Sequence, residues 1–300
     1  MSPKDLTALL VLSALWGGSF LFMRVAAPVL GPVVLIELRV LIAGLALLAF
    51  AVATRSLPAF RPHWKPFLVI GVVNSALPFI LISAATVHLT ASLAATLNAT
   101  TPLFGALVAA AWLGERLTPG RTAGLLLGLA GVTVLVGFGP LPLTPPVGLS
   151  VAASLLGALS YGVAAVYTKV HMADTPPLAL ALYSQLCAAG VLLPAVPLAL
   201  PGAVPSGAVI ASVLALAVLS TAAAYLLYFG LIQRAGPLRA TMVTYLSPAF
   251  GIVWGALLLR EPLTVWSFAG FGLILASMAL TTGLVPLGRT GAPISAGPRP

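Results

Sequence analysis

The chain consists almost entirely of apolar runs, each about the length of a membrane-spanning helix. Breaks made of charged residues, proline and glycine separate these runs, which lie near residues 6–26, 32–53, 66–86, 90–112, 122–138, 147–170, 177–200, 207–231, 237–259 and 264–285. A helix needs roughly 20 apolar residues to cross a hydrocarbon core of about 30 Å. Because the runs show no polar–apolar alternation, they predict an all-α integral membrane protein with ten transmembrane helices.

Composition and charge argue against a soluble or nucleic-acid-binding protein. Hydrophobic residues make up 60% of the chain and charged residues only 6%, whereas soluble domains carry roughly a quarter charged residues. The net charge of +9 comes from cations that stand singly in short connections and build no basic face. We therefore expect the lipid bilayer and a small molecule as partners, and no nucleic acid.

The basic residues collect on one side of the predicted membrane topology. If Lys4 is cytoplasmic, the opposite side keeps only Arg24, Arg39 and Arg260, and the cytoplasmic side holds Arg55, Arg61, Lys65, Arg116, Arg121, Lys169, Arg234, Arg239, Arg289 and Arg299. The positive-inside rule then predicts a multi-pass inner (plasma) membrane protein with both termini in the cytoplasm. Residues 286–300, rich in glycine and proline, predict a disordered cytoplasmic tail.

The two halves of the chain repeat each other. With a shift of 146 residues, residues 99–118 align with 245–264, and the matched pairs include Pro102 with Pro248, Phe104 with Phe250, Gly105 with Gly251 and Glu115 with Glu261. With a shift of 145, Trp16 aligns with Tyr161, Arg24 with Lys169, and Pro32 with Pro177. Since five helices make one repeat, the second copy is inverted. We expect repeats at 1–140 and 147–285 around a central cavity.

Several motifs carry a family resemblance across both halves. They are LWGGSFLFMRVA from Leu15, PVVLIELRVLIAGL from Pro32, and the paired segments ending in LGERLT and LREPLT. With them the sequence resembles the drug/metabolite transporter superfamily, specifically the EamA-type exporters with ten helices and two EamA domains. Its length and aromatic content are similar to those of YddG-like aromatic amino-acid exporters. The resemblance implies a central cavity, export from the cytoplasm, and no organic cofactor. Glu37 departs from the family pattern.

Aromatic and polar residues inside several runs predict the wall of that cavity. Thr221, Tyr225 and Tyr228 share one helix face, because their spacing is i, i+4, i+7. Such rings can stack on a planar or cationic substrate, although a Trp or Tyr near the end of a run could instead anchor at the lipid interface. The candidate substrate-binding residues are Trp16, Phe20, Phe79, Asn98, Tyr161, Thr221, Tyr225, Tyr228 and Tyr245.

Two prolines within apolar runs are candidate hinges. Pro102 and Pro248 each remove a backbone donor and should kink their helices near the middle of the membrane. A static kink is the alternative, since proline is common in membrane helices. Asn98, four residues before Pro102, can hydrogen-bond either a substrate or a backbone carbonyl that the kink frees.

Glu37, Arg39 and Arg24 are the candidate intramembrane charges. A charge there costs roughly 2.5–3.5 kcal/mol on insertion scales, so Glu37 and Arg39 each need a partner or water. They point about 200° apart on one helix and should not pair with each other. Arg24 is the expected partner for Glu37. A structural ion pair or an interface position competes here with a role in gating.

No pattern in the sequence favours an enzyme or a metal protein. His63, His88 and His171 lie in separate connections without ligand spacing, and no nucleophile–base set is evident. We expect an exporter of amino acids or similar small metabolites that works by alternating access without obligatory proton coupling. The alternatives are a multidrug or cationic-compound pump and, in another class, a membrane-embedded enzyme or sensor. Small residues such as Gly251 and Gly255 fit a monomer or a homodimer.

Overall fold

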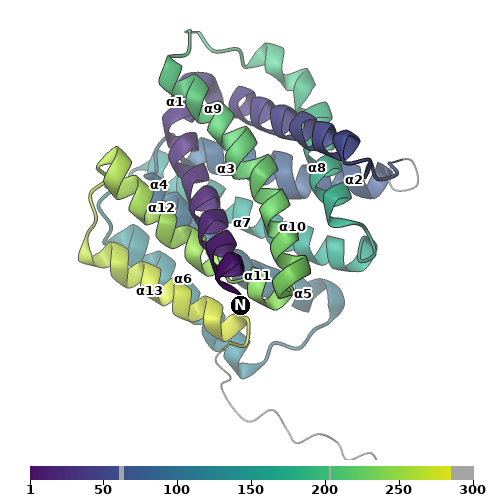
Figure 1. Cartoon of the computed structure of the whole chain (residues 1–300). Helices are drawn as coiled ribbons and strands as arrows, with labels where there is room; N and C mark the ends of the chain where they lie inside the picture. Colours follow the sequence, from purple (N-terminus) through teal and green to yellow (C-terminus); the bar gives the residue numbers. More distant parts are fainter. Residues whose placement is uncertain (61–63, 203, 285–300) are drawn as a thin grey trace, which may run out of the picture.

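The computed structural model of the chain is built from helices (Figure 1). It describes residues 1–60, 64–202 and 204–284, and every regular element within those ranges is helical. The predicted tail at 286–300 with Arg289 and Arg299, and also Arg61 and His63, lie outside the described residues.

The helices follow the predicted runs closely. In the first half they are α1 (Pro3–Ala53), α2 (Trp64–Ile70), the π-helix η2 (Gly71–Ala76), α3 (Leu77–Ala85), α4 (Ala91–Asn98), α5 (Thr101–Leu113) and α6 (Pro119–Gly137). In the second half they are α7 (Pro145–His171), α8 (Pro177–Leu192), the 3₁₀-helix η3 (Leu193–Leu198), α9 (Gly207–Leu214), the π-helix η4 (Ala215–Ala223), α10 (Ala224–Ala235), α11 (Pro237–Ala240), α12 (Val243–Leu259) and α13 (Val265–Thr281).

Helix α1 is two spans joined at a bend. A straight helix of its 51 residues would be about 77 Å long, more than twice the thickness of a hydrocarbon core. Gly31 has φ 71° and ψ 156°, a conformation that glycine adopts readily, and Pro28 and Pro32 flank it. The bend therefore divides α1 into a first arm (3–30) and a second arm (32–53), as the sequence predicts.

The described helices have the length and composition of membrane spans. Seven helices or joined helical segments are long and apolar enough to cross a membrane, and the two 17-residue helices α12 and α13 are shorter apolar helices. Large apolar side chains such as Leu126, Leu149 and Leu257 point outward, more than 60% exposed. An apolar outer surface of this kind is stable in lipid rather than in water.

The two halves interlock through equivalent helices. In the first arm of α1, a Cβ on Gly17 would lie 2.6 Å from the backbone oxygen of Ser247 in α12. In α7, a Cβ on Gly162 would lie 2.8 Å from the backbone nitrogen of Gly105 in α5. Gly17 aligns with Gly162, and the partner helices are also repeat-related. Each half thus presses its first helix against the fourth span of the other half.

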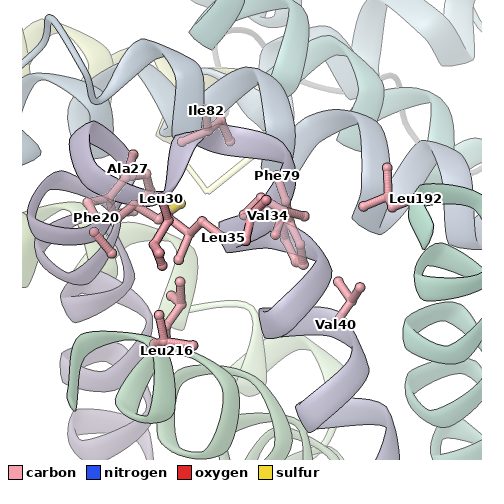
Figure 2. Close-up of a cluster of buried hydrophobic side chains, with 14 of the residues drawn as sticks. Phe20, Ala27, Leu30, Val34, Leu35, Val40, Phe79, Ile82, Leu192 and Leu216 are labelled. Carbon is pink, nitrogen blue, oxygen red and sulfur yellow. The ribbon is translucent and has the colours of Figure 1, made fainter. Parts of the chain in front are cut away.

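The largest apolar core lies where both arms of α1 meet the rest of the bundle. Figure 2 shows Phe20 and Leu35 from the two arms beside Phe79 and Ile82 of α3 and Leu216 of η4. Residues from α4, α8 and α9 complete this cluster. Because the core joins elements of both halves, it fixes the walls of the space that lies next to it.

Candidate functional site

A cavity of about 410 Å³ lies between the two sequence repeats. Its lining residues come from both arms of α1 and from η2, α3, α4, α5, α7, η4, α10, α12 and α13. Its lining residues are Trp16, Ser19, Phe20, Met23, Arg39, Asn74, Phe79, Ile82, Ala95, Asn98, Ala99, Thr101, Pro102, Tyr161, Ser220, Thr221, Tyr225, Tyr228, Thr244, Ser247, Pro248 and Met278.

Many of the lining residues occupy equivalent positions in the two repeats. The equivalent pairs are Trp16 with Tyr161, Asn74 with Ser220, Phe79 with Tyr225, Ile82 with Tyr228, Asn98 with Thr244, Thr101 with Ser247, and Pro102 with Pro248. Both repeats therefore contribute the same parts of their helices to one shared cavity, in the way that transporters with inverted repeats form a site at the repeat interface.

Two π-helical segments border the cavity at equivalent positions. Asn74 lies in η2, while Ser220 and Thr221 lie in η4. A π-helix widens the turn, and such segments often occur at functional sites. Sequence reasoning missed both, because one additional residue in a turn leaves an apolar run unchanged. The only sequence signal is the polar pair Asn74–Ser75, which aligns with Ser220–Thr221.

Aromatic rings form much of the wall. The ring centroid of Trp16 lies 5.2 Å from that of Tyr228 and 6.4 Å from that of Tyr225. Phe79 meets Tyr161 edge to face, with centroids 6.3 Å apart. These separations are typical of interacting aromatic pairs. The rings therefore hold one another in place around the cavity.

Arg39 supplies the only formal charge among the residues that line this cavity. Its side chain is 5% exposed. Its Nε donates a hydrogen bond to Thr221 Oγ1 at 3.0 Å, and its guanidinium carbon lies 3.6 Å from the centroid of the Phe79 ring. The lining contains no Asp or Glu, and no described carboxylate lies within ion-pair distance of Arg39.

Two buried acceptors at the cavity have no protein partner among the described residues. They are Asn98 Oδ1 and Ser220 Oγ. Buried polar atoms are normally hydrogen-bonded, and an unpaired one needs an explanation such as a bound molecule. Together with Arg39 they give the cavity one cationic group and neutral acceptors between aromatic walls.

The structure brings most of the predicted site residues together. Eight of them line the cavity, namely Trp16, Phe20, Phe79, Asn98, Tyr161, Thr221, Tyr225 and Tyr228. Tyr245 does not: its hydroxyl shares a hydrogen bond of 2.5 Å with Thr282 Oγ1, away from the cavity lining. Pro102 and Pro248 line the cavity as well, Pro102 just after the break between α4 and α5, and Pro248 within α12.

The predicted pairing of Arg24 with Glu37 is wrong. Arg24 Nη1 instead donates hydrogen bonds to the backbone oxygens of Thr86 and Val87, both at 2.7 Å. Carbonyl groups at the end of α3 have no hydrogen-bond partner within the helix and attract a cation, so Arg24 binds them instead of Glu37. Glu37 is buried, and its Oε2 has no hydrogen-bond partner among the described residues.

Within the described residues, no group of three or more His, Cys, Asp or Glu side chains could hold a metal ion. His88 lies in the α3–α4 connection, whereas His171 is the last residue of α7 rather than part of a connection as the sequence predicts. The single cysteine, Cys187, is half-buried in α8.

A family of transporters and several proteins named as transporters are similar to this chain. The EamA-like transporter family matches residues 4–137 and again residues 148–283. The uncharacterized transporter YvbV of Bacillus subtilis is 28% identical over 93% of this chain and 92% of its own length. The uncharacterized inner membrane transporter YedA of Escherichia coli is also 28% identical, over 92% of this chain and 89% of YedA.

Two further similarities concern substrate and fold. A probable terminal-alkyne amino-acid exporter of Streptantibioticus cattleyicolor is 28% identical over 92% of this chain and 93% of its own length. A solved protein structure superposes with a TM-score of 0.66 at 22% identity, covering 95% of this chain and 98% of that one. At this identity the superposition shows the fold alone.

Proposed function

We propose that this chain, which belongs to the EamA-like transporter family, exports amino acids or similar small metabolites across the inner membrane by alternating access. The family and its named relatives identify a membrane transporter of small molecules. The amino-acid substrate is our proposal, supported by the cavity and by the relative whose name gives amino-acid export.

The observation that carries this proposal is the shared cavity. Repeat-related residues line it from both halves, and its wall combines aromatic rings with unpaired polar atoms. A cavity at the interface of inverted repeats can open to either side when one repeat rocks against the other. We propose repeats at 1–140 and 147–285, with Pro102 and Pro248 as equivalent hinge positions.

The lining argues against the rival function, a pump for cationic compounds. A desolvated organic cation needs a carboxylate or a cluster of aromatic faces, and Arg39 places a positive charge beside those faces instead. A like charge at close range repels a cation. A substrate with a negative or zwitterionic group suits the same cavity better.

Flux measurements test the proposed function. Purified protein in liposomes should transport labelled amino acids, most of all those with planar side chains, faster than nucleosides or cationic dyes. Empty liposomes and liposomes with an unrelated membrane protein provide the background rate. Faster flux of the dyes than of every amino acid would support the multidrug pump instead.

The proposed topology predicts the positions of two arginines. Arg116 follows α5 and Arg260 follows α12, which are equivalent helices of the two repeats. If the repeats are inverted, a cysteine at position 116 should react with an impermeant reagent only from the cytoplasmic side, and one at 260 only from the outside. Both would be measured in a Cys187→Ala background. Reaction of both from the same side would contradict the topology.

A further inference from the structure

We infer that Arg39 binds the carboxylate of the transported substrate, so that the cavity selects small carboxylates with a planar or aromatic side chain. This inference rests on the proposed transport function and adds to it the group that the protein recognises. Arg39 is a buried cation at a cavity whose lining has no acidic residue.

The contacts of Arg39 leave part of the guanidinium free for a ligand. A guanidinium has five N–H donors in a planar fork that matches a carboxylate. The structure pairs Nε with Thr221 Oγ1 at 3.0 Å, and Nη1 with the weak acceptor Met23 Sδ at 3.9 Å. Phe79 holds the plane from one face. These contacts orient the fork without neutralising its charge.

The second repeat has no equivalent of Arg39. With the shift of 145 that aligns Pro32 with Pro177, position 39 aligns with Ser184. Ser184 Oγ donates a hydrogen bond to the backbone oxygen of Ala181, and it does not line the cavity. Only the first repeat therefore contributes a positive charge to the wall, which gives a polar substrate a single orientation.

The remaining lining groups suit the rest of an amino acid. The unpaired acceptors Asn98 Oδ1 and Ser220 Oγ can receive N–H groups, and aromatic faces attract an ammonium group. These acceptors and ring faces carry no formal charge, whereas Arg39 offers the carboxylate a full positive charge and a planar fork that can donate two parallel hydrogen bonds. The carboxylate should thus matter more than the ammonium group for recognition.

Four related compounds separate these contributions without any mutation. L-Phenylalanine has both groups, 3-phenylpropionate only the carboxylate, phenethylamine only the ammonium group, and phenylalaninamide a neutral amide in place of the carboxylate. In liposomes, we expect competition against labelled phenylalanine flux by phenylalanine and 3-phenylpropionate. The other two compounds should need at least about tenfold higher concentrations, by the energy of hydrogen bonds to charged groups.

Variants at position 39 connect this preference to the arginine. Arg39→Gln should abolish the preference for carboxylates, so that all four compounds compete at about equal concentrations. Arg39→Lys should keep part of the preference because the charge remains. Thr221→Val, which removes only the hydrogen bond to Nε, should weaken it less than Arg39→Gln does. Equal competition by all four compounds in the unaltered protein overturns the inference, and so does a preserved preference in Arg39→Gln. Absence of phenylalanine flux counts against the proposed function instead.

Charged residues at the two ends of the bundle carry a second, independent proposal. At one end, Glu261 in the α12–α13 connection accepts hydrogen bonds from the backbone N–H groups of Ala91 and Ser92, at 2.6 and 3.0 Å, and from Ser92 Oγ at 2.5 Å. Arg24 binds the backbone oxygens of Thr86 and Val87 in the same α3–α4 connection. Together they tie the second repeat and the first arm of α1 to that connection.

At the opposite end, the repeat-related residues bind each other. Glu261 contacts the start of the segment Ala91–Leu113, whereas Glu115 lies two residues beyond the end of that segment. The two carboxylates are therefore at opposite ends of the bundle. Glu115 accepts hydrogen bonds from Lys169 Nζ at 3.0 Å and Arg121 Nη1 at 3.1 Å. These donors, Lys169 first, hold the pKa of the Glu115 carboxyl below its ordinary value. Lys169 aligns with Arg24, and Glu115 with Glu261.

An exposed residue of the cavity lining lies at the end away from Glu261. Thr244, near the start of α12, is an exposed lining residue, whereas α12 ends at Leu259 beside Glu261. We propose that the contacts of Arg24 and Glu261 form a latch that closes one end of the cavity. In the transport cycle this latch opens.

Cysteine labelling tests the latch independently of the substrate. In a Cys187→Ala background, Thr101→Cys reports access to the cavity by an impermeant thiol reagent from the Glu261 side, the outer face in the proposed topology. Glu261→Ala should raise that labelling rate several-fold, and Arg24→Gln should do the same. The matched change at the other end, Glu115→Ala, should not raise it. Unchanged labelling in both latch variants, or an equal rise in Glu115→Ala, overturns the proposal.

Discussion

Alanine at Tyr225 should reduce amino-acid flux about 30-fold while leaving the amount of folded protein in the membrane nearly unchanged. Tyr225 lines the cavity and meets Trp16 edge to face. Truncating an aromatic side chain that contacts a desolvated ligand typically costs about 2 kcal/mol, which corresponds to about 30-fold in affinity. Initial rates at substrate concentrations below saturation, divided by the protein content of the liposomes, measure this effect.

Tyr245 provides the matched control for this variant. It has the same side chain in a helix that also contributes to the cavity, but its hydroxyl contacts Thr282 and its ring does not line the cavity. Tyr245→Ala should therefore keep at least about half of the flux per folded protein. Trp16→Ala and Asn98→Ala should behave like Tyr225→Ala. If all three cavity variants transported as well as the control, the cavity would not be the substrate site.

A pH gradient should not drive uphill accumulation of the substrate. The chain has five acidic residues, and none of them lines the cavity. Glu115 and Asp5 form ion pairs, and Glu261 binds the start of α4. A coupling carboxylate has to bind and release protons in a cavity that is reached alternately from both sides. We therefore expect facilitated diffusion.

The measurement compares flux at matched substrate gradients with and without an imposed pH gradient. The two initial rates should agree, and the final internal substrate concentration should not exceed the external one. Glu37 is the residue to check, because its buried carboxylate has an oxygen without a partner among the described residues. Accumulation above equilibrium that disappears in Glu37→Gln would contradict our account and make Glu37 the coupling residue.

The positions of the helices and the aromatic part of the cavity wall were predictable from the sequence for physical reasons. A membrane-spanning helix needs a long apolar run, and its backbone groups must be hydrogen-bonded within the helix. The apolar runs therefore marked the helices, and Gly31 lies between two of these runs. Repeat alignment and helical spacing then placed Trp16, Tyr161 and Tyr225 on equivalent inner faces. Tyr245 was misplaced because spacing alone does not determine which neighbour a helix face meets.

Features that depend on tertiary contacts could not be predicted. Arg24 reaches the free carbonyl groups at the end of α3, and no pattern along the sequence shows which helix end will lie nearby. The direction of Arg39 toward the cavity follows from the hydrogen bond to Thr221, 182 residues away in the chain. The π-helices η2 and η4 likewise reflect packing at the cavity rather than local composition.

The central claim is that substrate occupies a cavity between the repeats that opens alternately to the two sides. Labelling of Thr101→Cys in the Cys187→Ala background tests it most directly, with an impermeant thiol reagent applied from either side in the presence or absence of the amino acid that shows the fastest flux. Our account predicts labelling from both sides and slower labelling from each when that amino acid is present. Labelling from one side only, at a rate that the amino acid does not change, would contradict it.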